Sequence, residues 1–397
     1  MAELLTVDDA LARILGHARL LPKETVAVAD AAGRGLREPA TARVDLPPFP
    51  SSAMDGFALR AADVPGELPV AFRIATGSPA PGPLPVGAAA GISTGGAVPT
   101  EADAVVPVEV ADDRGTSVVT TEPAIAGQHV RPRGGDVRAG DIVVKAGERL
   151  RAAQIGSLAA AGVSEVVCST RPRVAVLATG SELRASGETL ELGQIYESNG
   201  AMIAAVLAHA GAVVDVLPVV EDDLAAHREA IARGLEADVL VTTGGVSMGE
   251  HDLVRRTEAE LGVDEVFWGV AVKPGKPLSF GVRGDTLVFG LPGNPVSSLV
   301  GALVFVTPAL LARQGAADPR PRLSVGLASR ALRRNAHRDE FVRAVRTDEV
   351  DAVHLEPISG QESHMIARAA AADALVYVPR GDGEISAGSA VRFLPLD

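Results

Sequence analysis

Cysteine and aromatic residues are scarce in this chain of 397 residues. The single cysteine, Cys168, permits no disulfide within the chain and no site built from several thiolates. It lies in the apolar run EVVCS, where we expect a small buried side chain. Aromatic residues make up 3% of the chain, which disfavours a surface that stacks the bases of single-stranded nucleic acid.

Positive charge is also in short supply. The chain has 37 Lys and Arg against 50 Asp and Glu, so its formal net charge is −13 at pH 7. This balance disfavours nucleic acid and anionic membranes as partners. We therefore expect small-molecule substrates, and an anionic substrate would have to be attracted by a local group of cations.

Long hydrophobic runs and two well-known catalytic motifs are missing. The apolar run at residues 296–312 is shorter than the roughly 18–20 residues of a membrane-spanning helix, so we expect a core helix there. The N-terminal segment MAELLTVDDALARILGHA is acidic and amphipathic, unlike a signal peptide, which predicts a cytoplasmic location. Neither H-E-x-x-H nor G-x-x-x-x-G-K-[ST] occurs, which counts against zinc peptidases and P-loop proteins.

Residues 170–317 alternate apolar strands with amphipathic helices. This alternation predicts a doubly wound, mostly parallel sheet, in which ligands bind beyond the carboxyl ends of the strands. Residues 1–20 carry apolar side chains at helical spacing, and we expect this N-terminal helix to pack on the α/β domain.

The remaining segments are rich in Gly, Pro and short β-like runs. Residues 47–137 predict an all-β insert that begins with PPFPSSAMDGFAL, read as an ordered loop, and residues 318–397 predict a C-terminal β-barrel. Residues 21–46 and 138–169 flank the insert, and we expect them to form one discontinuous linker domain. The chain is thus predicted to be a multidomain protein of α/β and β domains.

Polar turns follow the strands of the α/β segment. These turns are TGSEL with Glu182, VVEDD with Asp222, GGVSMGEHD with Ser247 and Asp252, and LPGNPVSS with Asn294 and Ser297. Each carboxylate alone could cap a helix. Carboxylates at neighbouring strand ends repel one another unless a cation joins them, and Mg²⁺ prefers such oxygen ligands. Glu182, Asp222 and Asp252 are therefore the predicted metal group.

Two glycine-rich turns and the segment KPGKP point to an anion. Gly244 and Gly245 let backbone N–H groups approach a phosphate, although a Gly-Gly turn is also an ordinary tight connection. Lys273 and Lys276 are held between prolines, which favours a preorganised cationic site over two solvated lysines. The residues alone thus predict an enzyme site for a phosphate or another oxyanion.

With these motifs in view, the chain closely resembles the molybdopterin molybdenumtransferases, the family of MoeA-type proteins and the gephyrin E domain. The resemblance rests on PPFPSSAMDGFAL, STGGAVPTEADAVVPVE, RPRGGDVRAGD, TGSEL, GQIYESN, TTGGVSMGEHD, KPGKP, GLPGNPVSS and GQESHMIARAAAADALVYVP, in this order along the chain. It implies that molybdenum from molybdate enters adenylylated molybdopterin and that AMP leaves, with Mg²⁺ assisting. It also implies a homodimer, with the molybdopterin adenylyltransferase and recipient molybdoenzymes as protein partners.

The resemblance assigns roles to individual positions. Lys273 and Lys276 would bind molybdate, together with Ser363 and an arginine, Arg338 or Arg343. The implied catalytic residues are Asp55, Asp136, Glu182, Asp222 and Asp252. The residues implied to bind pterin, phosphate or AMP are Thr94, Gly244, Gly245, Ser247, Pro292, Asn294, Pro295 and Ser297. In the implied dimer, Asp55, Thr94 and Asp136 reach the site from the partner chain.

Three positions depart from the family pattern. Ser181 and Gly135 stand where the family usually has acidic residues, and Glu197 stands where it has Asp. We expect activity to survive these changes. Alternatives are an adenylyltransferase of the preceding step, a tungstate-inserting relative, and a gephyrin-like scaffold without catalysis.

Overall fold

The computed structural model describes residues 4–221, 223–245 and 253–396. The central strands of the α/β domain are largely apolar, as expected where helices cover both faces of a sheet. The spatial order of the strands is β16 (Val213–Val216), β13 (Arg173–Ala178), β17 (Val239–Thr243), β21 (Thr286–Leu291), β20 (Ser279–Arg283) and β18 (Asp264–Trp268). The first four lie parallel to one another, whereas β20 and β18 pair antiparallel.

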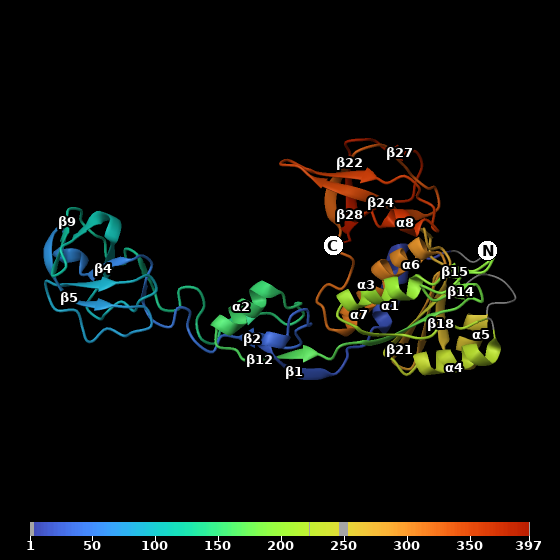
Figure 1. The fold of residues 1–397 in the computed structure, drawn as a ribbon, viewed down its shortest axis with the longest axis horizontal. Helices are drawn as coiled ribbons and strands as arrows, with labels where there is room; N and C mark the ends of the chain where they lie inside the picture. Colours follow the sequence, from blue (N-terminus) through green and yellow to red (C-terminus); the bar gives the residue numbers. More distant parts are fainter. Residues whose placement is uncertain (1–3, 222, 246–252, 397) are drawn as a thin grey trace.

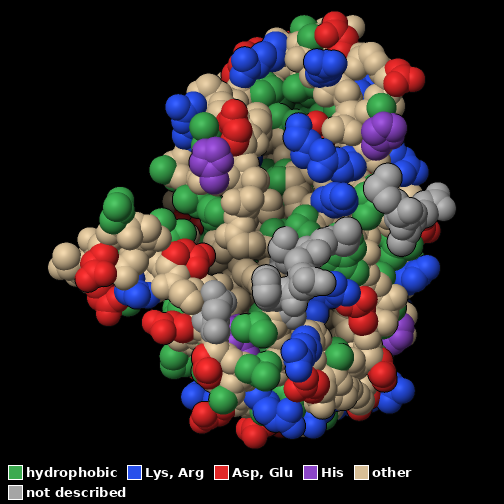
Figure 2. Space-filling view, turned by 90° about the vertical axis from the view of Figure 1, so that its right-hand side faces the viewer, with side chains coloured by type: hydrophobic (Ala, Val, Ile, Leu, Met, Phe, Trp, Pro, Cys, Tyr) green, Lys and Arg blue, Asp and Glu red, His purple; other side chains and the backbone are tan. Residues whose placement is uncertain are grey.

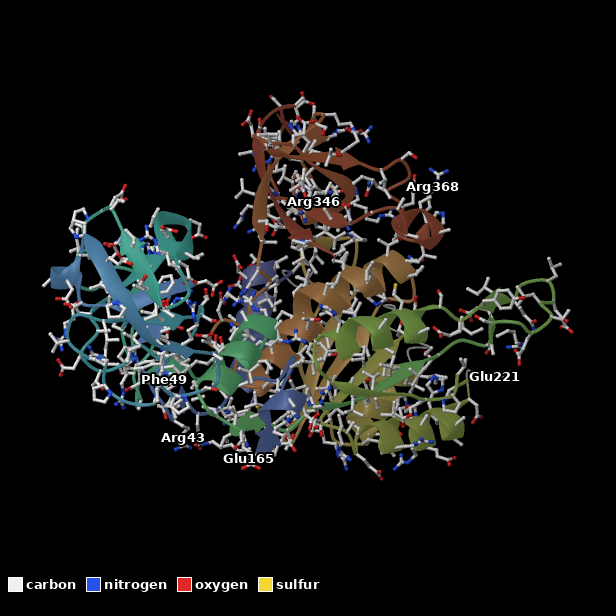
Figure 3. All side chains as sticks on the ribbon, turned by 60° about the vertical axis from the view of Figure 1, so that its left-hand side comes forward. Arg43, Phe49, Glu165, Glu221, Arg346 and Arg368 are labelled. Carbon is white, nitrogen blue, oxygen red and sulfur yellow. The ribbon has the colours of Figure 1, made fainter. Side chains whose placement is uncertain are left out.

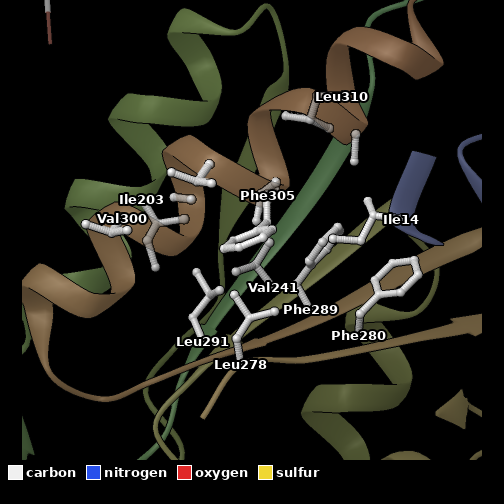
Figure 4. Packing of buried hydrophobic residues seen from close by; sticks show 14 of the residues in the cluster. Ile14, Ile203, Val241, Leu278, Phe280, Phe289, Leu291, Val300, Phe305 and Leu310 are labelled. Atoms are coloured by element: carbon white, nitrogen blue, oxygen red, sulfur yellow. The ribbon is translucent and has the colours of Figure 1, made fainter. Parts of the chain in front are cut away.

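One face of this sheet carries a helical layer with a large apolar core (Figure 4). Its elements are α1 (Val7–His17), α3 (Asn199–His209), α6 (Pro295–Gly301), the π-helical turn η4 (Ala302–Val306) and α7 (Thr307–Arg313). Phe289 from β21 and Phe305 from η4 are fully buried in this core. Ile14 of α1 joins it, so the N-terminal helix packs on the α/β domain.

The opposite face is covered by α4 (Leu224–Gly234) and α5 (Leu253–Glu260). Ile231 and Val254 from these helices pack on Leu240 of β17 in a separate apolar cluster. The two clusters show that helices lie on both faces of the sheet, and the central strands β13, β17 and β21 are buried along almost their whole length.

Helices α6 and α7 are joined through η4 into one apolar run, Pro295–Arg313. By length and composition this run of 19 residues could cross a membrane, and it is longer than the sequence pattern suggested. However, 67% of its most apolar window is buried inside the protein, as in the core helix of a globular domain.

Residues on both sides of the β insert share one small core. Strand β1 (Lys23–Ala27) pairs antiparallel with β12 (Glu165–Ser169), and Leu36, Leu150 and Cys168 are all fully buried in it. The other elements are η1 (Val28–Asp30), β2 (Ala40–Thr41), β11 (Ile142–Val144) and α2 (Ala152–Ala160). Burial raises the pKa of the Cys168 thiol, in keeping with a packing role.

The insert is built around a β-sheet. Its strand order is β7 (Ala104–Pro107), β4 (Gly56–Leu59), β6 (Ala89–Ile92), β5 (Gly66–Ile74), β9 (Ser117–Thr120) and β8 (Ala111–Asp113). Beside it lie β3 (Ser51–Ser52), η2 (Ala61–Asp63), η3 (Val108–Val110) and β10 (Val130–Arg131).

The prediction that PPFPSSAMDGFAL is only a loop is wrong, since Ser51–Ser52 forms the short strand β3 and the last four residues form a longer strand. Gly56–Leu59 forms the buried strand β4, which pairs with β6 and β7 on its two sides. A Cβ on Gly56 would lie 2.0 Å from the carbonyl oxygen of Val106, so the glycine reflects close packing within the sheet and does not mark a turn.

The C-terminal segment forms a closed β-barrel. The ring runs β24 (Asp339–Asp348), β25 (Val353–Pro357), β22 (Ser324–Ala328), β28 (Ala390–Pro395) and β26 (Ala374–Val378), and β26 pairs back with β24. Short elements beside it are β23 (Leu332–Arg333), β27 (Glu384–Ile385) and α8 (Ile366–Ala369). This barrel confirms the predicted C-terminal β-barrel and, with the other domains, the predicted multidomain architecture.

The domains follow one another along an elongated molecule (Figure 1). The insert lies at one end, the small core shared by its flanking segments lies in the middle, and the α/β domain carries the barrel at the other end. Phe49, where the chain enters the insert, is 43% exposed (Figure 3). The strand β19 (Val272–Lys273) connects the last two domains, because it leaves the α/β domain and pairs in parallel with β24 of the barrel.

Candidate functional site

A cavity of about 280 Å³ opens between the α/β domain and the barrel. It is lined by Lys273, Pro274, Gly275, Lys276, Pro277, Pro292, Asn294, Ser297, Arg338, Glu340, Phe341, Gln361, Glu362 and Ser363. Figure 2 shows Lys and Arg side chains gathered on this face of the molecule, between the barrel above and the α/β domain below. Seven residues predicted to bind substrate thus come together, from segments far apart in the sequence.

The KPGKP loop forms one wall of the cavity. Gly275 has φ +108°, in a region that other residues rarely adopt, and a Cβ there would lie 3.5 Å from the carbonyl oxygen of Ser297. The loop therefore lies against the first turn of α6. This contact places Lys273 and Lys276 beside the N-terminus of α6. Lys273 is half-buried and Lys276 is exposed.

The start of α6 forms the floor. Pro295 occupies the first helical position, where its missing N–H costs nothing, and Ser297 in the first turn is 4% exposed. The backbone N–H of Val296 donates to the carbonyl oxygen of Ser363 at 3.0 Å. This hydrogen bond joins the helix start to the barrel loop and brings Ser363 into the cavity.

The structure separates the two arginines that the sequence left as alternatives. Arg338 lines the cavity, and the side-chain oxygen of Asn335 fixes its backbone by accepting the Arg338 N–H at 3.0 Å. Arg343 is 1% exposed and donates to the carbonyl oxygens of Gly360 and Met365. Burial lowers the pKa of the Arg343 guanidinium. Arg343 therefore holds the loop that carries Ser363, and Arg338 is the arginine that lines the cavity.

Glu340 is a cavity residue that the sequence analysis missed. Its carboxylate Oε1 lies 2.7 Å from Nζ of Lys273, and its side chain is only 13% exposed. The pairing of β19 with β24 sets Lys273 opposite Glu340. No local motif signals this contact, because the two residues belong to different domains.

The glycine-rich turn lies at the carboxyl end of β17. Gly244 has φ +92°, and a Cβ there would lie 2.4 Å from the carbonyl oxygen of Thr179. Gly245 has φ +62°, and a Cβ there would lie 2.6 Å from Cγ2 of Val254. Both positions thus require glycine. The turns after β13, β17 and β21 share one edge of the sheet because these strands are adjacent and parallel.

Asn199 ties two of these turns together. Its amide Nδ2 donates to Thr243 Oγ1 at 2.9 Å and to the carbonyl oxygen of Gly293 at 2.7 Å. Its Oδ1 is buried and has no hydrogen-bond partner among the described residues. Thr243 Oγ1 also donates to the carbonyl oxygen of Pro292, which holds the backbone of this predicted ligand-binding residue in place. Asn199 closes the motif GQIYESN, but the sequence analysis gave it no role.

The predicted acidic group is only partly described. Glu182 is exposed after β13, and its carboxylate folds back so that a Cβ on Gly180 would lie 2.5 Å from its Oε2. Asp222, Ser247 and Asp252 lie outside the described residues. Within residues 4–221, 223–245 and 253–396, no group of three or more His, Cys, Asp or Glu side chains is placed to hold a metal ion.

The remaining predicted residues lie with the insert, at the other end of the molecule. The backbone N–H of Thr94 donates to Oδ1 of Asp55 at 2.6 Å, so these two form one local unit. Asp136 is exposed in the connection that leaves the insert, and its N–H donates to the carbonyl of Leu46. Within one chain, none of the three lines the cavity.

That connection is held by Asp45. Its carboxylate accepts the backbone N–H of Ala139 at 2.8 Å and Nε of Arg133 at 2.6 Å. The Ala139 hydrogen bond, followed by that from Arg133, lowers the pKa of Asp45 below its usual range. Both bonds thus favour the charged carboxylate.

Curated relatives match the chain over almost its full length. A protein named molybdopterin molybdenumtransferase 2 from Mycobacterium tuberculosis is 37% identical over 388 residues, 94% of this chain and 95% of the relative. Residues 5–162 match the MoeA N-terminal region (domain I and II), residues 175–312 a probable molybdopterin binding domain, and residues 326–396 the MoeA C-terminal region (domain IV). The chain belongs to the MoeA family.

Further relatives agree with this assignment. The molybdopterin molybdenumtransferase of Haemophilus influenzae is 32% identical and covers 99% of both chains. A crystal structure of a molybdopterin biosynthesis MoeA protein from Pyrococcus horikoshii aligns over 100% of both chains with a TM-score of 0.79 and 29% identity. A second crystal structure, of a molybdopterin biosynthesis MoeA protein from Pyrococcus horikoshii OT3, covers 99% of this chain with a TM-score of 0.84 at 26% identity. The family predicted from the sequence motifs is confirmed.

Proposed function

We propose that this chain is a molybdopterin molybdenumtransferase, which inserts molybdenum from molybdate into adenylylated molybdopterin and releases AMP. The observation that carries the proposal is the cavity between the α/β domain and the barrel. There Lys273, Lys276 and Arg338 converge with the buried Ser297 at a helix start, although the chain as a whole is acidic.

The cavity suits a tetrahedral dianion such as molybdate. Ammonium and guanidinium groups supply charge-assisted hydrogen bonds, and the hydroxyls of Ser297 and Ser363 supply further donors. The loop and the barrel fix these groups before the anion arrives, so little ordering is needed on binding. Tungstate has the same charge and shape, and the same residues would accept it.

The pterin and its phosphates are assigned to the sheet edge next to this cavity. The backbone of Gly244 and Gly245 is open to close approach there, and the buried Oδ1 of Asn199 is an available acceptor for a ligand N–H. In this arrangement the dithiolene of the pterin would face the oxyanion, and the adenylyl phosphate would lie near Glu182.

Magnesium is the metal ion proposed to assist. Carboxylate oxygens are the donors that Mg²⁺ prefers, and Glu182 presents one such carboxylate, exposed at the sheet edge. Glu182, Asp222 and Asp252 would hold the ion, whose charge would offset the negative charge on the phosphate as AMP leaves.

We also propose that a second copy of the chain completes the site. Asp55 and Thr94 belong to the insert, which lies at the far end from the α/β domain (Figure 1), and Asp136 lies in the connection that leaves it. An elongated homodimer would bring the insert of one chain to the α/β domain of the other. We further propose that the protein is located in the cytoplasm.

The direct test supplies purified protein with adenylylated molybdopterin, Mg²⁺ and molybdate, and follows AMP release. Release that depends on molybdate supports the transferase. Tight pterin binding without AMP release contradicts it and favours a scaffold. Formation of adenylylated molybdopterin from ATP and molybdopterin would instead identify the adenylyltransferase of the preceding step.

The acidic group has its own test. We expect Asp252→Ala or Asp222→Ala to abolish molybdenum insertion while thermal unfolding stays unchanged. A variant that keeps full activity would remove that aspartate from the proposed magnesium group.

A further inference from the structure

The cavity proposed for molybdate contains a carboxylate, Glu340, that forms an ion pair with one of the cavity's cations, Lys273. Oε1 of Glu340 lies 2.7 Å from Nζ of Lys273. Glu340 is only 13% exposed, whereas 44% of the Lys273 side chain is exposed. An ion pair with one largely buried partner is screened less by salt than a pair on the open surface. The Lys273 ammonium is therefore held in a fixed place beside the cavity.

The pair is built into the junction between two domains. Lys273 is the last residue of β19 from the α/β side, and Glu340 is the second residue of β24 in the barrel. The parallel pairing of β19 with β24 sets the two residues side by side. Asp339, next to Glu340, is buried and accepts the backbone N–H of Arg380 at 2.9 Å, which anchors that end of the strand.

A carboxylate in an anion site acts against the anion. The described lining residues with positive charge are Lys273, Lys276 and Arg338, and those with negative charge are Glu340 and the exposed Glu362. A bound dianion would feel repulsion from Glu340 in proportion to its own charge. The repulsion from Glu362 is weaker because water surrounds that side chain.

We propose that Glu340 is a positioning residue that holds the Lys273 ammonium in the cavity and keeps oxyanion affinity low. The proposal rests on the proposed function, since it takes the cavity as the oxyanion site. Its consequence for the reaction is that molybdate binds in a geometry ready for transfer but is not retained too tightly. Tight binding of molybdate would lower the free energy of the bound ground state and so raise the barrier to molybdenum transfer.

Binding of two matched anions to the protein without pterin tests this idea. Molybdate and perrhenate are tetrahedral and of similar size, but molybdate carries two negative charges and perrhenate one. Glu340→Gln removes the charge and leaves an amide oxygen that can still accept from Lys273. We expect molybdate to bind roughly tenfold more tightly to this variant and perrhenate about threefold, because Coulomb energy scales with the charge of the ligand.

Three further variants separate charge from structure in the same calorimetric titrations. Glu362→Gln removes an exposed carboxylate from the same cavity and should change molybdate affinity less than about twofold. Glu340→Asp keeps the charge but shortens the side chain. It should weaken the ion pair with Lys273 without a tenfold gain in molybdate affinity. In a Lys273→Ala background, a second change of Glu340 to Gln should tighten molybdate at least as much as in the wild type, because the repulsion is no longer offset by the pair.

Several results would overturn the proposal. Equal weakening of both anions by Glu340→Gln would mean a purely structural role, and an equal gain from Glu362→Gln would mean a general charge effect. In the AMP-release assay, Glu340→Gln should lower both the molybdate concentration for half-maximal rate and the rate at saturation. If the wild type releases no AMP, the proposed function fails, whereas the binding comparison still decides the role of Glu340.

Discussion

The two ends of this molecule carry opposite kinds of chemistry. The cavity between the α/β domain and the barrel gathers Lys273, Lys276 and Arg338, and its walls come from two domains joined by β19 and β24. The insert lies at the other end (Figure 1), and Asp55 on the insert and Asp136 on its connection are exposed. In the proposed dimer, the cations at one end and the acidic residues at the other would form two halves of one site. The proposal therefore requires both ends for activity.

The cavity end is held by buried polar contacts, and Arg343→Met should have the largest effect on it. This change leaves the carbonyl oxygens of Gly360 and Met365 without their buried donor. We expect the free energy of unfolding of the barrel to fall by about 3 kcal/mol, which differential scanning calorimetry would measure.

Arg346→Met on the same strand is the matched control for that prediction. Arg346, labelled in Figure 3, forms an ion pair with the exposed Asp348, so its loss should cost less than about 1 kcal/mol. Equal destabilisation by both variants would show that Arg343 has no special part in holding the loop.

Lys276→Ala should have the next largest effect, on molybdate and not on the fold. Loss of one charge-assisted contact of about 2 kcal/mol raises the molybdate concentration needed for AMP release roughly 30-fold. Pterin binding should change little. Lys145→Ala, an exposed lysine in the middle of the molecule, is the control and should leave the molybdate dependence as it was. An unchanged molybdate dependence in Lys276→Ala would take this lysine out of the oxyanion site.

The insert end depends on a carboxylate whose effect is smaller and depends on pH. Hydrogen bonds from Ala139 and Arg133 lower the pKa of Asp45 in the folded protein. Their stabilisation is therefore present at neutral pH and is lost as the pH falls through that lowered pKa. At neutral pH, Asp45→Asn should speed amide hydrogen exchange in residues 133–139, and the difference from the wild type should shrink in acid. Identical exchange at pH 7 would contradict this role.

Much of the cavity could be predicted from the sequence because its residues follow strands or lie between prolines. Lys273, Lys276, Asn294 and Ser297 belong to such short motifs, and the structure brings them together. Glu340 could not be found in this way, since its partner lies in another domain and only the pairing of β19 with β24 reveals it.

Other features were hidden because they depend on packing. Arg338 and Arg343 are the same residue type in one segment, and only the burial of Arg343 separates their roles. The sequence PPFPSSAMDGFAL reads as a loop from its prolines and glycine, yet Gly56 sits in a buried strand because Val106 approaches it closely. Local propensity yields to such tertiary contacts.

Complementation between two inactive variants tests most directly whether the two ends form one site across a dimer. Asp55→Asn would disable the insert end and Lys276→Ala the cavity end, each assayed alone for molybdate-dependent AMP release. When the two are co-expressed, half of the dimers are mixed and each mixed dimer holds one intact site, so we predict about a quarter of the wild-type activity. Activity no higher than that of the single variants, with an active wild type in the same assay, would contradict a site shared between two chains.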